Sequence, residues 1–426
     1  MSFLVQNCSR SKEKVSSATD SPPYDKEKYF KNKDQNATSP IGSPHSSRGD
    51  FPNIMIEYGN EPLQYDVYTT IGKGCNDAAT ISVAKHIASG HNVAIRQVDL
   101  DKVESEENVN AVQSEIVLCR QLNHESILPY YTSFVHNNEV WTVMPLMAYG
   151  SCRDLMHAYF TSGLPEQAIA YILRDLLSAL EYLHVRGIIH RGVKSSHILI
   201  SAAGRVCLSG MRNAFQLMQH GEWRKLVFTY PDNPRKMLCW FSPEILEQNL
   251  TGYDTKSDIY SLGITACELA NGYAPFTDMP ATQMLLEKLN GTKPVLADCT
   301  TIADLTADEN VTNSDVPEDS GIDNVSGSIQ KNSALGYAYN RTFSQNFHQF
   351  VELCLERDPD RRPTASSLLY HPFLKNLRKR STSVLPSLLH PVTPLLDVSK
   401  LPKDDSAVED LAEEMEDLHF DEDWEF

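Results

Sequence analysis

The amino-acid sequence predicts an α+β protein of two lobes, in which a small β-rich lobe precedes a larger helical lobe. Two short runs of β-branched and aromatic residues, at positions 93–95 and 140–144, are bounded by polar residues in the way that strands are. From Pro165 onward the apolar residues recur at helical spacing. Residues 260–269 are apolar on nearly every side, which is typical of a helix buried inside a helical lobe.

The first long helix is predicted from the single apolar face that follows Pro165. The pattern continues for about 20 residues, and Gly187 is placed to end it, since glycine is a common signal for the end of a helix. The apolar face consists of Ile169, Ile172, Leu173, Leu176, Leu180 and Leu183.

Composition and charge exclude several classes of protein. The chain has 426 residues, 41% of them hydrophobic, and a net charge of −18. The negative charge argues against general binding to nucleic acid or to anionic membranes, because basic surfaces drive both. The sequence has no run of about 20 apolar residues, so it predicts no membrane span. Nine cysteines without a C-x-x-C pair suit a reducing, intracellular compartment better than a disulfide framework or a zinc site.

Changes in composition along the chain predict its organisation. Residues 1–62 are polar without apolar periodicity, and we expect them to be disordered. Residues 63–374 form the folded domain, interrupted at about 297–335 by a polar insertion loop with eight acidic residues and no basic one between Asp298 and Asp323. Residues 375–426 are a C-terminal extension, whose residues 401–426 hold twelve acidic residues and one lysine, as solvated, disordered tails do.

Short motifs in residues 65–373 occur in the order found in protein kinases, and the folded domain resembles that family at each of them. A glycine-rich stretch at 71–77, V-A-I-R at 93–96 in place of V-A-I-K, and Glu115 come first. H-R-G-V-K-S-S-H at 190–197 resembles H-R-D-L-K-x-x-N, and G-M-R at 210–212 stands in place of D-F-G. S-P-E at 242–244, D-I-Y-S-L-G at 258–263 and Arg362 follow. The resemblance implies the bilobed protein-kinase-like fold.

Three departures from the kinase motifs predict that the chain is not an active enzyme. A kinase uses a carboxylate to accept the proton of the substrate hydroxyl, and this chain has Gly192 there; losing such a base costs about 10²–10⁴-fold in rate. The two positions that supply oxygen ligands to magnesium are His197 and Gly210. We therefore expect a pseudokinase without a bound metal, in which His197 is a hydrogen-bonded core residue rather than a metal ligand.

The residues that remain predict binding of ATP without magnesium and without hydrolysis. Gly72 and Gly74 still allow the backbone to approach phosphates, although Asp77 replaces the third glycine. Arginines at 96 and 212 could supply positive charge in place of the metal. In the alternative, Arg96 only pairs with Glu115 and Arg212 points to solvent. Met144 and Met147 are then plain core residues. The predicted ATP-binding residues are Ile71, Gly72, Gly74, Ala79, Arg96, Met144, Met147, Lys194, His197 and Arg212.

Other retained residues predict structural contacts rather than chemistry. His190 and Arg191 are expected to brace the loop that carries Gly192, and Asp258 to anchor that loop from its helix. Two ion pairs are predicted, Arg96 with Glu115 and Glu244 with Arg362.

A closer resemblance is to the STRAD pseudokinases, the sterile-twenty-related adaptors. H-R-G-V-K-S-S-H-I-L-I-S at 190–201 resembles that family's H-R-S-V-K-A-S-H-I-L-I-S, with glycine in place of serine at 192. M-A-Y-G-S at 147–151, K-S-D-I-Y-S at 256–261, M-P-A-T-Q-M-L-L at 279–286 and the final W-E-F also match. The match is closer to the alpha than to the beta member of the family.

This resemblance implies partners and a role. STRAD proteins activate a client serine/threonine kinase, liver kinase B-one, in a heterotrimer with an armadillo-like scaffold, calcium-binding protein thirty-nine, and they occur in cytoplasm and nucleus. It implies that Trp424, Glu425 and Phe426 dock on the scaffold, where aromatic anchors can each contribute about 2 kcal/mol or more. An inert solubilising tail is the alternative. For the whole chain, the alternatives are a pure scaffold that binds no nucleotide and a weakly active kinase.

Overall fold

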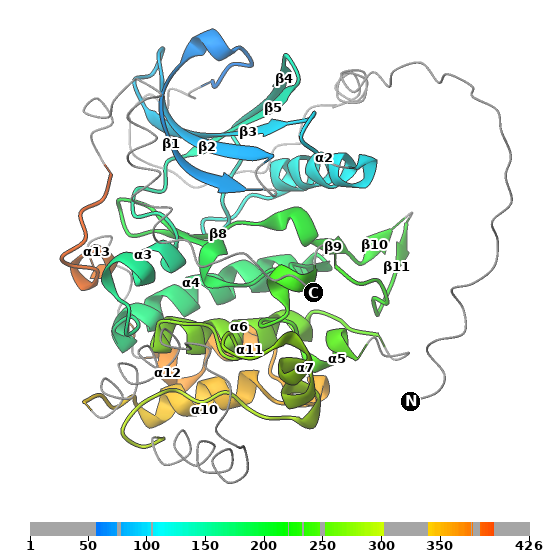
Figure 1. Ribbon diagram of the computed structural model, residues 1–426, viewed down its shortest axis with the longest axis vertical. Helices are drawn as coiled ribbons and strands as arrows, with labels where there is room; N and C mark the ends of the chain where they lie inside the picture. The colour runs from blue at the N-terminus through cyan, green and yellow to red at the C-terminus, as the bar shows by residue number, and fades with distance from the viewer. Residues whose placement is uncertain are drawn as a thin grey trace, which may run out of the picture. The chain divides into compact units, whose positions relative to one another are not determined.

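A five-stranded antiparallel sheet forms the N-terminal part of the described chain, with its strands in the order β1-β2-β3-β5-β4 (Figure 1). The computed structural model describes residues 57–74, 78–103, 105–219, 221–231, 234–247, 252–301, 340–375, 377 and 384–395. A 3-10 helix, η2 (Pro62–Gln64), leads into the sheet. The strands are β1 (Tyr65–Gly74), β2 (Ala79–His86), β3 (Asn92–Asp99), β4 (Thr132–His136) and β5 (Glu139–Pro145).

Side-chain alternation along the central strand β3 gives the sheet two buried faces, because neighbouring residues of a strand point to opposite sides. Val93 and Ile95 pack on one face together with Val143. Ala94 lies on the other face, paired in register with Met144 of β5. Both runs that the sequence predicted as strands are therefore strands, and each contributes to both faces.

Helix α2 (Glu106–Gln121) packs beside this sheet (Figure 1). The hydroxyl of Ser105 caps its first turn by accepting a hydrogen bond from the backbone N–H of Asn108. The inner side of the helix buries apolar residues such as Val112, and it also buries the carboxylate of Glu115. A buried carboxylate requires a partner, so this helix is fixed by a polar contact as well as by packing.

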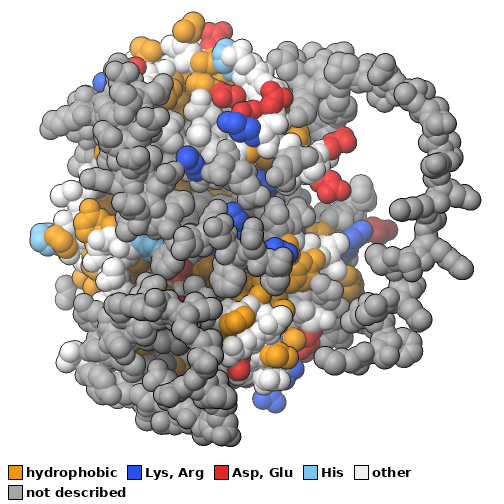
Figure 2. Space-filling view, viewed as in Figure 1, with side chains coloured by type: hydrophobic (Ala, Val, Ile, Leu, Met, Phe, Trp, Pro, Cys, Tyr) orange, Lys and Arg blue, Asp and Glu red, His pale blue; other side chains and the backbone are white. Residues whose placement is uncertain are grey.

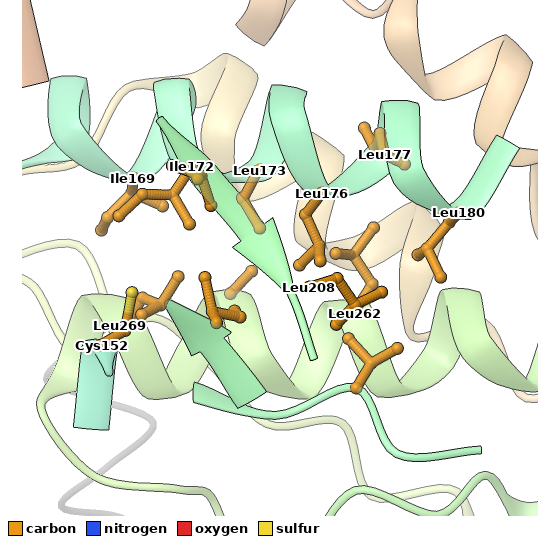
Figure 3. Packing of buried hydrophobic residues seen from close by; sticks show 14 of the residues in the cluster. Cys152, Ile169, Ile172, Leu173, Leu176, Leu177, Leu180, Leu208, Leu262 and Leu269 are labelled. Carbon is orange, nitrogen blue, oxygen red and sulfur yellow. The ribbon is translucent and has the colours of Figure 1, made fainter. Parts of the chain in front are cut away.

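Helices α4 (Glu166–Val185) and α6 (Lys256–Asn271) form the centre of the larger lobe. Figure 3 shows the apolar residues of α4 directed at Leu262 and Leu269 of α6, with Leu208 between the two helices. Each fully buried leucine or isoleucine contributes about 1.5–3 kcal/mol to folding. The six apolar positions predicted from the sequence are all buried. The other helices are α3 (Cys152–Tyr159), α5 (Pro243–Leu246), α7 (Ala281–Asn290), α10 (Gln345–Cys354), α11 (Ala365–Leu369), α12 (Pro372–Lys375) and α13 (Val384–Leu388).

Short strands and 3-10 helices hold the loops that carry the degenerate motifs. Strands β6 and β9, β7 and β8, and β10 and β11 pair antiparallel. The sheet β1–β5 and the helices that follow it confirm the predicted architecture, a small β-rich lobe before a larger helical lobe. The short elements are β6 (Ile188–Ile189), η3 (Ser195–His197), β7 (Ile198–Ile200), β8 (Val206–Leu208), η4 (Met211–Asn213), β9 (Phe215–Gln216), β10 (Met218–Gln219), β11 (Glu222–Trp223), η5 (Pro234–Met237) and η7 (Pro359–Arg361).

Residues 57–62, which the sequence assigned to the polar N-terminal segment, belong to the described structure. The ring of Tyr58 stacks on that of Tyr131 with centroids 4.3 Å apart, and the hydroxyl of Tyr65 donates to the carbonyl of Gly59 at 2.8 Å. Residues 1–56 and 396–426, including the acidic tail and Trp424, Glu425 and Phe426, lie outside the described residues. Among the helices that are described, none has the length and apolar character needed to cross a bilayer.

The two ends of the insertion are held together by a polar clasp, which we define as Asp298, Arg341 and His348. The buried carboxylate of Asp298 accepts hydrogen bonds from the backbone N–H of Phe343 at 2.8 Å and from Nε2 of His348 at 2.9 Å. The guanidinium of Arg341 donates to the carbonyls of Ala297 at 2.6 Å and Ala270 at 2.8 Å. The predicted loop therefore begins with residues fixed in the fold, while positions 302–339 lie outside the described residues.

Candidate nucleotide-binding site

The adenine end of the predicted site is an apolar cluster between the sheet and the larger lobe. Ala94, Met144 and Met147 are buried together with Cys207, and Leu199 packs against them. Ala79 is also buried, while Ile71 on β1 is partly exposed. A Cβ placed on Gly72 would approach no atom closer than 3.9 Å, so β1 has room beside it. Cys75, Asn76 and Asp77, at the end of the glycine-rich stretch, lie outside the described residues.

Arg96 of β3 and Glu115 of α2 form a bidentate ion pair. The guanidinium donates to both carboxylate oxygens, at 3.1 and 2.9 Å, and the hydroxyl of Tyr130 donates to the same carboxylate at 2.9 Å. Burial favours the neutral acid, but Arg96 and Tyr130 outweigh it and hold the pKa of Glu115 below its ordinary value. The pair fixes α2 against the sheet, which is the arrangement that a kinase uses when it is closed around its nucleotide.

Arg212 of η4 contacts α2 as well. Its Nη2 donates to the side-chain oxygen of Asn108 at 2.7 Å, and its charge adds to the lowering of the Glu115 pKa. The sequence offered phosphate or solvent as the environment of Arg212, and the structure gives a third one, the first turn of α2. Nothing in the sequence around Asn108 distinguished it from any other polar residue of an exposed first turn.

The ring of His197 lies against Gly210, the residue that stands in place of the D-F-G aspartate. Its Nδ1–H donates to the carbonyl of Gly192 at 2.7 Å, which ties two of the degenerate positions together. A Cβ built on the third, Gly210, would lie 2.5 Å from His197 Nδ1 and 2.6 Å from its Cγ. Gly210 also has φ +80°, a left-handed conformation that side chains disfavour. Burial lowers the pKa of His197 to about 3, so the ring is neutral at physiological pH.

The loop that carries Gly192 is fixed from α6. The carboxylate of Asp258 accepts hydrogen bonds from the backbone N–H groups of His190 at 2.8 Å and Arg191 at 2.9 Å, and from Nε2 of His184 at 2.9 Å. His190 in turn donates through Nε2 to the carbonyl of Ser209 at 3.0 Å. The framework of the kinase loop is thus intact around a position without a side chain.

Lys194 lies against the larger lobe. Its Nζ is 5.5 Å from the ring centroid of Trp240, whose Nε1–H donates to Glu268 at 3.0 Å. Burial, followed by the charge of Arg153, lowers the pKa of Lys194 to about 8, and the side chain is still mainly protonated at neutral pH.

Glu244 and Arg362 form the second predicted ion pair, deep in the larger lobe. Nη1 and Nη2 of Arg362 donate to the two carboxylate oxygens at 2.6 and 2.8 Å. The same guanidinium also donates to the carbonyls of Glu356, Arg357 and Lys256. Burying two charges costs a large desolvation penalty, and hydrogen bonds of this geometry are what allows their attraction to offset it.

Replacing His197 with asparagine is expected to make folding less sensitive to acid. The pKa of His197 is about 3 in the folded chain and 6.5 without burial, so between these values only the unfolded chain binds a proton there. The stability contribution of His197 therefore falls as the pH decreases below 6.5, by up to about 1.4 kcal/mol per pH unit. Urea unfolding at about pH 6.5 and about pH 5 should show a smaller loss for His197→Asn than for wild type.

The control for this experiment is His136→Asn, because His136 is exposed at the end of β4. That variant should keep the acid sensitivity of the wild type. Equal acid sensitivity of His197→Asn and wild type would contradict the buried, neutral state of His197.

A family model and individual known proteins both match this chain over most of its length. The family model described as protein kinase domain matches residues 65–374. The chain is 45% identical over 381 residues to STE20-related kinase adapter protein alpha of Homo sapiens, which covers 88% of this chain and 87% of that protein. It is 46% identical over 349 residues to the alpha protein of Gallus gallus, covering 81% of this chain and 89% of that protein. Identity to STE20-related kinase adapter protein beta of Homo sapiens is lower, 40% over 332 residues, with 77% and 79% covered.

Proposed function

Because the chain belongs to the protein kinase domain family, and within it to the STE20-related kinase adapter proteins, we propose that it is a catalytically inactive adapter that binds ATP and activates a client kinase. The client would be a serine/threonine kinase of the liver kinase B-one type, held in a heterotrimer with the armadillo-like scaffold, in cytoplasm and nucleus. The observation that carries the proposal is the His197 ring beside Gly210, combined with an intact Arg96–Glu115 pair.

Inactivity follows from chemistry at three positions. Gly192 offers no base for the substrate hydroxyl, and the neutral His197 presents an imidazole where phosphoryl transfer needs oxygen ligands for magnesium. The third position, Gly210, has no space for a carboxylate while His197 keeps its place. Activity would thus require several simultaneous changes.

Nucleotide binding is supported by the groups that remain. An apolar cluster around Ala94 and Met144 suits adenine, and Arg96, Lys194 and Arg212 supply positive charge that phosphates require. Arg96 forms a bidentate ion pair with Glu115, whereas Arg212 hydrogen-bonds to the neutral amide of Asn108 and acts on Glu115 only through its charge. Arg212 is therefore the residue that could turn to a phosphate at the smaller cost.

A partner surface is supported by apolar side chains that remain exposed. Met218, Trp223, Leu226 and Phe228 follow η4 in the chain, and Trp223 and Phe228 are 52% and 66% exposed. On the face of the molecule that Figure 2 views, hydrophobic side chains are exposed beside charged ones. Exposed aromatic residues of this kind typically mark protein-binding surfaces. We assign this segment to the client, and the terminal Trp424, Glu425 and Phe426 to the scaffold.

ATP with a chelator is expected to raise the melting temperature of the protein, because a ligand at about 100 times its Kd stabilises the folded state by about 2.7 kcal/mol. Arg212→Ala should lose most of this shift. Asn108→Ala is the matched control, since it breaks the same Arg212–Asn108 hydrogen bond but leaves the arginine in place. No shift in the wild type would favour a pure scaffold, whereas equal shifts in all three proteins would contradict a phosphate contact by Arg212.

Reconstitution with the purified client and scaffold tests activation. The client's phosphorylation of a peptide should rise when this protein is added, and Trp223→Ala with Phe228→Ala should abolish the increase. A client whose activity does not change would overturn the proposal. Phosphotransfer by this protein alone, with magnesium or manganese, would instead support a weakly active kinase.

A further inference from the structure

The segment that follows the larger lobe contacts the linker between the two lobes. We call residues 146–150 the linker and residues 384–395 the strap. The backbone N–H of Leu395 in the strap donates to the carbonyl of Ala148 in the linker at 2.8 Å. Ala148 directly follows Met147, the residue predicted to face adenine. The strap therefore ends on the backbone of the candidate nucleotide site.

Hydrogen bonds from another element also hold the linker. Strand β7 bonds it through Ile200, whose carbonyl accepts from the N–H of Tyr149 and whose N–H donates to the carbonyl of Gly150, both at 3.0 Å. Gly150 also closes a turn by donating to Met147 at 2.8 Å. The carbonyl of Ala148 takes part in neither contact, and it is the atom to which the strap bonds.

The strap is anchored in the core of the larger lobe. Leu385 and Leu389 are buried, and α13 packs against α4, the central helix of that lobe. Figure 1 shows α13 and the short segment that leaves it. Leu389 and Leu395 are six residues apart, a span that reaches at most about 20 Å when extended. A segment this short, with one end buried in the core, restricts where Ala148 can move.

We infer that the strap is a positioning element for nucleotide binding. The inference rests on the nucleotide binding proposed above. The Leu395–Ala148 hydrogen bond holds the linker in the conformation that presents the Met147 backbone to the adenine edge. Coupling between two sites is reciprocal, so bound nucleotide also stabilises the strap.

Two variants of the full-length chain isolate the hydrogen bond. Leu395→Pro removes the side chain and the backbone N–H, because proline has no amide hydrogen. Leu395→Ala removes the same side chain and keeps the N–H. In hydrogen exchange without nucleotide, the amides of Tyr149 and Gly150 should exchange about 3–10-fold faster in the proline variant than in the alanine variant. Equal exchange would overturn the strap's role in holding the linker.

Nucleotide affinity provides the second readout. Leu395→Pro should bind a fluorescent ATP analogue about 3–10-fold more weakly than Leu395→Ala. The two variants should have the same melting temperature. Equal affinities would refute the coupling. In the wild type, the analogue should slow exchange of the Leu395 amide. If the wild type binds no analogue at all, the proposed function fails, and the exchange experiment on Tyr149 and Gly150 still decides whether the strap holds the linker.

Discussion

Replacing Gly210 with aspartate, the change that would restore the kinase carboxylate, is expected to destabilise the protein by about 3–4 kcal/mol and to yield no activity. The new Cβ would lie 2.5 Å from His197, and the ring could move only by giving up its hydrogen bond to Gly192. The backbone at φ +80° adds strain of its own. Urea unfolding measures the loss.

Gly221→Asp separates these two causes. Gly221 has φ +81°, nearly the same as Gly210, but a Cβ there would meet nothing within 4 Å. We expect this variant to lose only about 1 kcal/mol. Combining Gly210→Asp with His197→Ala should recover at least half of the loss, because alanine has none of the ring atoms that the new Cβ would meet. Equal losses for Gly210→Asp and Gly221→Asp would contradict the steric argument.

Replacing Arg362 with alanine is expected to cost about 3–5 kcal/mol of folding free energy. The change leaves the carboxylate of Glu244 buried without its counter-charge, and it removes the donors for three backbone carbonyls. Unfolding in guanidinium chloride gives the difference from wild type.

Arg361→Ala is the matched control for Arg362→Ala, since it removes the same side chain one residue earlier. The Arg361 side chain is 75% exposed, and its Nε lies 3.7 Å from the carboxylate of Asp358. Exposed pairs of this kind contribute at most about 1 kcal/mol. A double variant, Glu244→Gln with Arg362→Met, should lose less than Arg362→Ala because no uncompensated charge remains. A loss of under 1 kcal/mol for Arg362→Ala would be evidence against a pair that stabilises the lobe.

The elements that the sequence predicted well are those with a clear local pattern. The β-branched run at 93–95 indicated a strand, and the helical face after Pro165 indicated which side of its helix is buried. The positions of Arg96 and Glu115 could also be predicted, because the kinase motifs fix the strand and helix that carry them.

Other features of the site depend on contacts between residues far apart in sequence. Arg212 and Asn108 are 104 residues apart, and neither has a local pattern that indicates the other. The bond from Leu395 to Ala148 involves only backbone atoms, which any sequence possesses. The place of the His197 ring was partly predictable as a core histidine, but its overlap with Gly210 requires the left-handed backbone at that glycine.

The clasp of Asp298, Arg341 and His348 makes the insertion a suitable place for protein engineering. The chain leaves and re-enters the fold between two segments that are already bonded to each other. Doubling the length of the chain between fixed ends costs only about 0.6 kcal/mol in closure entropy. A fluorescent reporter domain inserted between positions 302 and 339 should therefore leave the melting temperature of the host nearly unchanged, and it would allow assembly with partners to be followed by energy transfer in living cells.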